Sequence, residues 1–547
     1  MKRVLAAAAA AALLIAVASL HGQVSIDRLL QADREPHNWL TYSRTYSNQR
    51  FSPLTQITPA NVANLELQWV WQARSLEKFE ATALVVDGLL YTVQAPNDVV
   101  ALDAKSGRIF WTFSHTPAPD ARLCCGRVNR GVSILGDTLF MGTIDAHLIA
   151  LDAKTGQVRW KTQVAGSNER YAITHAPLVV RDSVIVGTAG GDFGVRAFIA
   201  AFDAKTGRER WRFYTVPATG EPGNDTWSGE SWKTGGAAVW NAGAYDPDAN
   251  LVYFGTGNPW PDWDGRDRRG DNLYSDSVVA LDAATGRLKW HYQFTPHDEL
   301  DYDSTQVPVL ADIDWQGRPR KVMLWANRNG VFYVLDRTNG QFLRATPFTK
   351  VNWVNGWDAK GKPNRVLSPT PEGTLVYPNN QGATNWYSPS FSPRTGLFYI
   401  PTWADTYSVY RKTPGANAVP FTEGQFFAGT FPTMTLPPMV GAATNTRLPQ
   451  EGYGTIQAVD PKTGERKWEF RMNDVTDSGV LSTATDLVFA GGREGYFFAL
   501  DAKTGTLLWK STVGGQVASG PMTYAVNGRQ FVAVSAGNNL FVYALRP

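Results

Sequence analysis

An eleven-residue turn motif recurs along the whole chain and constrains its fold more than any other feature. One copy reads ALDAKTGQVRW, from Ala150 to Trp160. An apolar run leads to an Asp that can hydrogen-bond to the backbone ahead and to a Gly that suits a left-handed turn position, and a second run follows. Each copy therefore predicts a β-hairpin. The closing Trp is expected to lie flat between neighbouring units, with its N–H turned to a partner.

The spacing of this motif predicts a closed ring of similar units. Its Asp position, or the equivalent residue, recurs at Asp103, Asp152, Asp203, Asp282, Asp336, Ser392, Asp460 and Asp501. Most of the intervals lie near the roughly 40–55 residues that one four-stranded propeller blade occupies. Eight copies therefore predict an all-β fold, an eight-bladed β-propeller with Trp-docking repeats. The alternative is an open solenoid, but neither end of the chain resembles a capping repeat.

The first residues are typical of an exported protein. Lys2 and Arg3 precede the Ala-rich apolar run Val4–Leu20, which ends in small residues. This pattern predicts a signal peptide over residues 1–20 and a propeller over residues 21–547. A retained membrane anchor is the alternative, but the run is short for a span that needs about 20 strongly apolar residues. We therefore expect a periplasmic protein if the source is a Gram-negative bacterium, with no membrane span in the mature chain.

The charge balance excludes one class of partner. The chain carries 52 Lys and Arg against 49 Asp and Glu, and it contains no run of basic residues. A nearly neutral chain has no overall attraction for nucleic acid, so we expect no nucleic-acid partner.

Both ends of the chain read as strands. The segments are Asn61–Ala73 and Leu540–Leu545. A blade shared between the two ends would close the ring and leave no loose sheet edge. We therefore expect one blade to be completed by the N-terminal segment.

Cys124 and Cys125 are adjacent, and they are the only cysteines in the sequence. In an oxidising compartment such a pair can form a disulfide, and two small buried thiols are the alternative. The pair provides neither a C-x-x-C-H haem attachment motif nor a Cys-based zinc site. The seven histidines show no ligand spacing such as H-x-x-x-H, so we expect no His-rich metal site.

Several short motifs, together with the Trp repeats, give the chain a family resemblance. They are CCGRVNRG (Cys124–Gly131), GGDFGVRA (Gly190–Ala197), GTGNP (Gly255–Pro259) and DYD (Asp301–Asp303). Over essentially the whole mature chain, the sequence resembles the pyrroloquinoline-quinone (PQQ)-dependent alcohol dehydrogenases of the methanol and ethanol dehydrogenase type. The resemblance implies an eight-bladed propeller with the quinone near its axis, between a ring closed by a vicinal disulfide and a Trp. It also implies a metal ion bound to both quinone and protein.

The resemblance implies a quinone-binding site made of individual residues of this sequence. The disulfide of Cys124 and Cys125 would form one wall, and Trp240 matches the stacking Trp of the family. The full set of quinone-binding positions implied is Cys124, Cys125, Arg130, Thr174, Gly190, Gly191, Trp240, Arg328 and Asn385.

The metal ligands implied by the resemblance are Asp192, Asn258 and Asp301. All three offer hard oxygen donors, which suit a hard cation such as calcium better than zinc or copper. The family carries Glu where this chain has Asp192, which is one methylene shorter.

Asp303 adds a fourth candidate ligand. In an extended segment, residues two apart point to the same side, so Asp301 and Asp303 can face one ion. A third carboxylate favours a trivalent over a divalent ion, and within the family an Asp at this place marks lanthanide-dependent members. We therefore expect a lanthanide(III) ion, with calcium(II) as the alternative. A solvated loop Asp is the other reading of Asp303.

The resemblance implies oxidation of a small alcohol to an aldehyde by hydride transfer to the metal-activated quinone. Asp301 would act as general base, and Arg328 would stabilise negative charge on the quinone oxygen. Electrons would pass to a separate carrier, by resemblance a soluble cytochrome c, and a homodimer is left open. The Pro-, Gly- and aromatic-rich insert over residues 405–454 is expected to be a lid or an interface.

Two other functions are weighed against this one. Propellers with the same repeat also serve as non-enzymatic scaffolds of envelope protein assembly, but a scaffold would not need the paired cysteines, Asp301 or Asp303. A quinone-dependent sugar dehydrogenase is the third reading, and it is disfavoured because those enzymes carry a membrane domain or use a different propeller.

Overall fold

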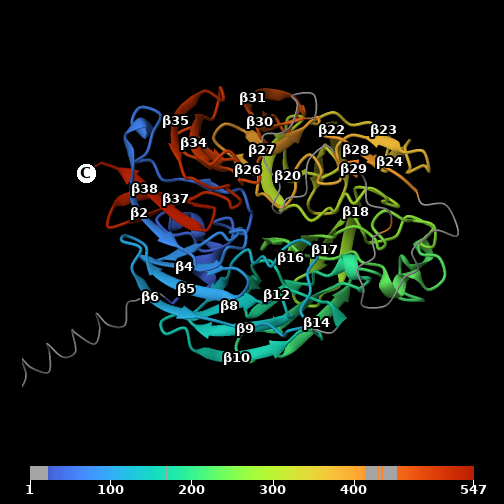
Figure 1. Ribbon diagram of the computed structural model, residues 1–547, viewed down its shortest axis with the longest axis horizontal. Helices are drawn as coiled ribbons and strands as arrows, with labels where there is room; N and C mark the ends of the chain where they lie inside the picture. The colour runs from blue at the N-terminus through green and yellow to red at the C-terminus, as the bar shows by residue number, and fades with distance from the viewer. Residues whose placement is uncertain (1–22, 167–168, 413–428, 430–432, 435–451, 547) are drawn as a thin grey trace, which may run out of the picture.

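The computed structural model describes residues 23–166, 169–412, 429, 433–434 and 452–546. The signal peptide expected over residues 1–20 lies outside the described residues, as does most of the 405–454 insert. Eight antiparallel sheets are arranged as blades of a ring, and the chain passes through them in order (Figure 1). The predicted eight-bladed, all-β propeller is confirmed.

Each blade is named here by its order along the chain. Blade 1 consists of β3 (Leu84–Val86), β4 (Leu89–Gln94), β5 (Asp98–Asp103) and β6 (Ile109–Phe113), and blade 2 of β7 (Ser133–Leu135), β8 (Thr138–Gly142), β9 (His147–Asp152) and β10 (Val158–Gln163). Blade 3 consists of β11 (Leu178–Val180), β12 (Ser183–Gly187), β13 (Phe198–Asp203) and β14 (Glu209–Tyr214), and blade 4 of β15 (Ala244–Asp246), β16 (Leu251–Gly255), β17 (Ser277–Asp282) and β18 (Leu288–Gln293). Blade 5 consists of β19 (Val309–Trp315), β20 (Arg318–Ala326), β21 (Val331–Asp336) and β22 (Phe342–Pro347), and blade 6 of β26 (Ser390–Ser392), β27 (Leu397–Ala404), β30 (Tyr453–Val459) and β31 (Arg466–Met472). Blade 7 consists of β32 (Leu481–Thr483), β33 (Leu487–Gly491), β34 (Tyr496–Asp501) and β35 (Leu507–Thr512), and β1 (Phe51–Ser52) pairs with β32. Blade 8 consists of β36 (Met522–Val526), β37 (Arg529–Ala536), β38 (Asn539–Leu545) and β2 (Leu65–Gln72).

Few elements lie outside the blades. Two small sheets are formed by β23 (Val354–Trp357) with β24 (Pro363–Arg365), and by β25 (Thr374–Val376), β28 (Ser408–Tyr410) and β29 (Thr433–Met434). The helical elements are α2 (Ile26–Leu30) and the 3₁₀ turns η1 (Ala32–Arg34), η2 (Val62–Asn64), η4 (Gly191–Phe193), η5 (Asn224–Thr226) and η6 (Ser231–Thr234). None of the helices in the described ranges has the length and apolarity needed to span a membrane.

The repeated motif folds as the sequence predicts. In blade 2, the Asp152 carboxylate accepts hydrogen bonds from the backbone N–H groups of Lys154 and Thr155, at 3.0 and 2.9 Å. Gly156 then takes a φ of +72°, in the left-handed region that a side chain disfavours. The motif therefore forms the β9–β10 hairpin, which joins the third and fourth strands of its blade.

In the six copies that end in Trp, this side chain packs against the next blade. The Trp160 ring covers Gly207 of blade 3, and its Nε1–H donates to the Ala204 carbonyl at 3.1 Å. The same pairing joins Trp111 to Gly156 and Ala153, Trp211 to Gly286 and Ala283, and Trp468 to Gly505 and Ala502. The buried hydrophobic clusters likewise extend across neighbouring blades. The predicted Trp docking is confirmed, and each interface between blades acts as a small core.

The expectation that each copy of the motif marks one blade is wrong in one place. The copy at Ser390–Ile400 forms the β26–β27 hairpin between the first two strands of blade 6, whereas the copy around Asp460 joins the last two strands of that same blade. Blade 8 contains no copy, because its last two strands come from opposite ends of the chain and need no turn. Seven blades therefore contain the eight copies, and the total of eight blades is nevertheless correct.

The shared closing blade is confirmed. β2 pairs antiparallel with β38, from Leu65 opposite Leu545 to Gln72 opposite Asn539. Trp69 of β2 covers Gly107 of blade 1, so the N-terminal segment supplies the same ring-over-glycine contact as the other interfaces. The ring is thus closed by hydrogen bonds between the two ends of the chain.

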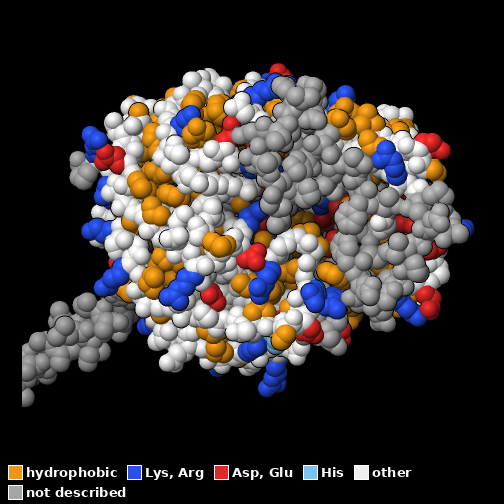
Figure 2. Space-filling view, viewed as in Figure 1, with side chains coloured by type: hydrophobic (Ala, Val, Ile, Leu, Met, Phe, Trp, Pro, Cys, Tyr) orange, Lys and Arg blue, Asp and Glu red, His pale blue; other side chains and the backbone are white. Residues whose placement is uncertain are grey.

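Charged side chains of both signs are interspersed over the face drawn in Figure 2, with no extended block of either sign among the described residues. This distribution agrees with the nearly equal numbers of acidic and basic residues in the sequence.

Candidate active site

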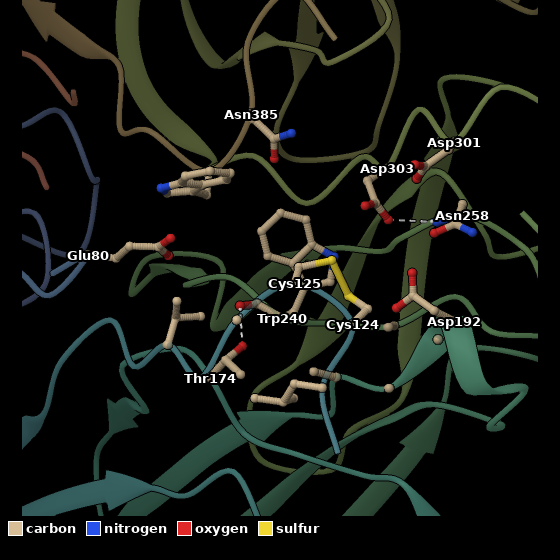
Figure 3. Close-up of a pocket in the computed structure, with 18 of the residues that line it drawn as sticks. Glu80, Cys124, Cys125, Thr174, Asp192, Trp240, Asn258, Asp301, Asp303 and Asn385 are labelled. Carbon is tan, nitrogen blue, oxygen red and sulfur yellow. Dashed lines mark hydrogen bonds between the residues drawn. A yellow bond between two sulfur atoms is a disulfide. The ribbon is translucent and has the colours of Figure 1, made fainter. Parts of the chain in front are cut away.

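Loops from six consecutive blades line one pocket in the ring. All thirteen residues proposed from the sequence lie in its wall: Cys124, Cys125, Arg130, Thr174, Gly190, Gly191, Asp192, Trp240, Asn258, Asp301, Asp303, Arg328 and Asn385. Figure 3 shows ten residues of the wall labelled around the cavity. The cavity encloses about 900 Å³ of empty space, part of it open to solvent.

Each loop leaves the end of a particular strand. The segment after β6 carries Cys124, Cys125 and Arg130, and the connections after β10, β12 and β14 carry Thr174, Asp192 and Trp240. The connections after β16, β18 and β20 carry Asn258, Asp301 with Asp303, and Arg328. Residues spread between Cys124 and Arg328 in the sequence therefore meet because the ring brings these loops to one place.

Cys124 and Cys125 form a disulfide, so the alternative of two free thiols is excluded. The bridge lines the pocket together with the ring of Trp240 (Figure 3). A carboxylate oxygen of Asp192 and both sulfur atoms lie within 4.8 Å of one another. The disulfide, the Trp and the acidic end of the pocket are thus neighbours.

Arg130 connects the polar side of the pocket to Trp240. Its guanidinium donates to the Trp240 carbonyl at 3.0 Å and to Thr174 Oγ1 at 3.2 Å, and it forms an ion pair with Glu80 at 2.7 Å. The guanidinium carbon lies 5.1 Å from the centre of the Trp240 ring. Thr174 also donates to the Trp240 carbonyl, at 3.1 Å. These contacts fix the position of the Trp240 backbone and hold a buried cation beside its ring.

Four oxygen-donor side chains form the acidic side of the pocket. Asp303 accepts from the backbone N–H of Asn258 at 2.8 Å. The Asn258 amide nitrogen donates to the buried Asp262 at 2.8 Å, which leaves the amide oxygen as the atom available to a cation. Asp192 and Asp301 complete the set (Figure 3).

Arg328 lies against two of these carboxylates. It approaches Asp301 at 3.0 Å and Asp303 at 2.5 Å, and both pairs are almost completely shielded from solvent. Burial alone would lower the pKa of Arg328, but the two carboxylates outweigh it and raise that pKa. One buried guanidinium therefore faces three carboxylates, and the acidic side of the pocket keeps an excess of negative charge.

This excess of negative charge contributes to the raised pKa values of the carboxyl groups. Burial, and then the charge of Asp303, raise the pKa of Asp192 to about 6. Burial raises the pKa of Asp301 well above its ordinary value, and although Arg328 lowers it, Asp303 and Asp192 raise it further. Asp301 also has a φ of +61°, which is uncommon for a residue with a side chain. A cation placed among these oxygens would relieve the repulsion, so the donor set fits a hard metal ion.

Gly190 and Gly191 lie where the chain leaves little room for a side chain. A Cβ on Gly190 would fall 2.2 Å from the Arg170 carbonyl oxygen, and Gly190 has a φ of +115°. A Cβ on Gly191 would fall 3.2 Å from that of Ala238. Gly190 therefore owes its identity to the backbone conformation that begins the short turn carrying Asp192.

The sequence did not single out several residues of the pocket wall. Trp386 packs with Tyr387 and Trp403 beside Trp240, and Glu80 carries the partner charge of Arg130. Gln381 and Val128 also line the cavity. Val128 lies within CCGRVNRG, but the other three belong to no repeat or motif named above, so only the three-dimensional arrangement reveals them.

Comparisons with known proteins give a consistent result. The family described as "PQQ: Glucose/ethanol/alcohol dehydrogenase, beta-propeller domain" matches residues 39–353 and 343–532. The quinohemoprotein alcohol dehydrogenase ADH IIB of Pseudomonas putida is 42% identical over 91% of this chain and 73% of its own length. The lanthanide-dependent methanol dehydrogenase of Methylacidiphilum fumariolicum is 35% identical over 96% of this chain and 89% of its own length. Among solved structures, a europium-containing methanol dehydrogenase superposes with a TM-score of 0.87 at 32% identity, covering 95% of this chain and all of that one.

Proposed function

This chain belongs to the family of PQQ-dependent alcohol dehydrogenases, and we propose that its pocket binds the quinone and one metal ion through the residues described above and oxidises an alcohol to an aldehyde. The observation that supports this placement most strongly is that all thirteen candidate residues line one cavity together with a vicinal disulfide. A non-enzymatic scaffold would have no need of that arrangement.

In this proposal, the two sides of the pocket hold two parts of the cofactor. The disulfide and Trp240 offer flat, apolar walls for an aromatic ring system, and Arg130, Thr174 and Asn385 offer polar contacts for its carboxylates and carbonyls. The buried Asn385 Oδ1 has no hydrogen-bond partner among the described residues, so it is available to a ligand in the cavity. Asp192, Asn258, Asp301 and Asp303 would hold the metal ion.

The bound quinone supplies the acceptor for the hydride of the alcohol carbon, and the bound ion supplies a Lewis acid. The chain supplies the acid–base chemistry. Asp301 would take the proton of the alcohol hydroxyl, because a carboxylate beside a cation is held ionised. Arg328, which lies 3.0 Å from Asp301, would stabilise negative charge that develops next to it.

We propose a lanthanide rather than calcium as the metal. With Asp303, the acidic side of the pocket contains three carboxylates. Each added negative charge strengthens the binding of a trivalent ion more than that of a divalent ion. The names of two relatives, the lanthanide-dependent and the europium-containing methanol dehydrogenases, support the same choice.

The route of the electrons and the setting of the enzyme are further parts of the proposal. The two cysteines of this sequence are joined to each other, and no C-x-x-C-H motif is present to attach a haem. We therefore propose transfer to a separate cytochrome c, in the periplasm after removal of the signal peptide. A homodimer stays open, and so does a lid or interface role for residues 405–454, most of which lie outside the described residues.

The substitution Asp301→Asn tests the proposed general base. The amide has nearly the same shape but cannot accept the hydroxyl proton, so turnover should fall by about 10²–10⁴-fold. The measurement is dye-linked alcohol oxidation by protein reconstituted with PQQ and metal, with bound quinone followed by its absorbance. An Asp301→Asn protein that binds the quinone and keeps full turnover would remove Asp301 from this role.

A further inference from the structure

A second group of potential metal ligands lies outside the pocket. His115, Asp145 and His147 each direct one ligand atom to a common point, and these atoms lie within 4.8 Å of one another. His115 follows β6 of blade 1, whereas Asp145 and His147 lie in the β8–β9 connection and at the start of β9 in blade 2 (Figure 1). The absence of a spaced His motif therefore did not exclude a His-containing cluster, because the ring brings the two histidines together from different blades.

Two of the three separations between the ligand atoms are close to those around a bound ion. His115 Nε2 lies 3.0 Å from Asp145 Oδ1, and His147 Nδ1 lies 3.4 Å from the same oxygen. Two donors bound tetrahedrally to zinc at its usual distances of about 2.0–2.2 Å are about 3.4 Å apart. Small side-chain adjustments would therefore bring all three donors onto one ion.

The nitrogen of His147 is the most informative atom of the cluster. His147 Nδ1 is buried and forms no hydrogen bond within the described part of the chain, although it lies close to the Asp145 carboxylate. A buried polar atom without a partner costs free energy unless something binds it. A metal ion between this nitrogen and the carboxylate would give the nitrogen a partner.

Burial and hydrogen bonds fix the position of the Asp145 carboxylate. Its side chain is 3% exposed, and its two oxygens accept from Thr143 Oγ1 and, at 3.1 Å, from the backbone N–H of Ala118. Supporting hydrogen bonds of this kind orient metal-bound carboxylates. The side chains of His115 and His147 are 10% and 17% exposed, which leaves a path for an ion.

We propose that His115, Asp145 and His147 form a binding site for one divalent first-row transition ion, of which Zn²⁺ is the probe. Two imidazoles and one carboxylate are a donor set that suits zinc and its neighbours, in contrast to the all-oxygen set of the pocket. This site is independent of the function proposed for the pocket.

Its position gives the ion a structural role. His115 and Ala118 begin the segment that leads to Cys124 and Cys125, and both contact Asp145. Beyond the disulfide, Asn129 donates to the Gly142 carbonyl at the end of β8, at 2.9 Å. The β8–β9 connection and the end of β8 therefore contact the disulfide segment on both sides of the bridge, and a bound ion would add a coordinate bond at the first of these contacts.

Zinc binding by the full chain, loaded with quinone and its pocket ion, tests the proposal. Isothermal titration and metal analysis after dialysis should find one Zn²⁺ per chain in the wild-type protein. Binding should weaken at least 10-fold in His147→Gln and in His115→Gln. His291→Gln, which removes an exposed histidine on β18, is the matched control and should bind as the wild type does.

A second readout protects the test against loss of folding. His147→Gln removes a nitrogen that makes no hydrogen bond, so the variant should fold, and Zn²⁺ should raise the Tm of the wild type and the control but not of this variant. Anomalous scattering at the zinc edge should place the ion among the three side chains. Absence of stoichiometric binding, equal binding by His147→Gln, or an ion located elsewhere would overturn the proposal.

Discussion

Asp303 carries the sharpest claim at the scale of single residues. Its carboxylate is engaged by the Asn258 backbone and by Arg328, so it is fixed in the wall of the pocket and is not a solvated loop residue. Asp303 lies in the same wall as Asp301 and Asp192 and is the third carboxylate on the acidic side of the pocket. The preference for a metal should therefore depend on this one side chain.

Asp303→Ala should change which metal restores activity. The wild type should reach full turnover with lanthanum or cerium at lower concentrations than with calcium. In the variant, the ratio of the calcium concentration to the lanthanide concentration needed for full turnover should fall at least 10-fold. Removal of one negative charge weakens binding of a trivalent ion more than binding of a divalent ion. The measurement is dye-linked turnover against concentration of each ion, with the exposed Asp314→Asn as control. If calcium alone restores full turnover and lanthanum does not, the lanthanide assignment is wrong.

His175, next to Thr174, should make stability sensitive to acid. It is fully buried, and its Nε2 accepts from the Gly187 N–H at 2.9 Å. Burial lowers its pKa from 6.5 to about 4. The unfolded chain therefore binds the proton first as pH falls, and about 3 kcal/mol of stability present above pH 6.5 should be lost on the way to pH 4.

The variant His175→Gln isolates this contribution. It removes the titrating group, so the free energy of unfolding should fall less between pH 7 and pH 4 than in the wild type. Chemical denaturation at each pH measures the difference, and His37→Gln, at an exposed position, should follow the wild-type profile. Parallel profiles for His175→Gln and the wild type would contradict the role given to this histidine.

The residues of the pocket were predictable from the sequence where they lie in short family motifs, such as the paired cysteines and the DYD segment. Glu80 and Trp386 were not, because each is defined by a partner far away in sequence: Arg130 for Glu80 and the aromatic cluster beside Trp240 for Trp386. The same reason hid the cluster around Asp145, whose two histidines come from different blades.

At the scale of elements, the turn motif specifies a hairpin but not its place in a blade. The segment around Ser392 satisfies the same turn chemistry as the others: the backbone N–H of Gly396 donates to the Ser392 carbonyl at 2.9 Å. The hairpin is nevertheless β26–β27, and it lacks the Trp that docks on the next blade. All six copies that end in Trp form the last hairpin of a blade, but the copy around Asp336 forms β21–β22, the last hairpin of blade 5, with Arg344 in place of the Trp. The Trp therefore marks a last hairpin where it is present, but its absence does not identify a first hairpin.

Gly207→Ala should test how much the Trp contact contributes. The new Cβ would lie 2.5 Å from Thr162 Oγ1 and 2.7 Å from the Trp160 ring, and the residue has a φ of +70°. We expect a loss of about 2–4 kcal/mol, from the left-handed backbone and the overpacking together. Gly396→Ala is the matched control, since it has the same φ but no neighbour within 4 Å, and it should cost about 1 kcal/mol. Equal losses in the free energy of unfolding would show that the ring contact contributes little.

At the scale of the whole molecule, β2 closes the ring. Replacing Leu65–Gln72 with a Gly/Ser segment of equal length would free the edge of β38 and remove the Trp69 contact with blade 1. The Tm of the whole protein should fall, with hydrogen exchange rising in blades on both sides of the opening. The same replacement of β10, a fourth strand that does not close the ring, is the control and should have a smaller and more local effect. Faster exchange confined to blade 8 would contradict the closing role of β2.

The propeller order also explains why the pocket exists only in the closed molecule. Its wall is assembled from the connections of six blades, so no single blade contains a site. The central claim is that this assembly places one quinone between the disulfide and Trp240, beside one cation on the acidic side.

A crystal structure of the protein reconstituted with PQQ and a lanthanide tests that claim most directly. It should place the quinone between the Cys124–Cys125 bridge and Trp240, and anomalous scattering should locate the lanthanide on Asp192, Asn258, Asp301 and Asp303. A quinone bound elsewhere, or a lanthanide bound away from these four side chains, would contradict the account.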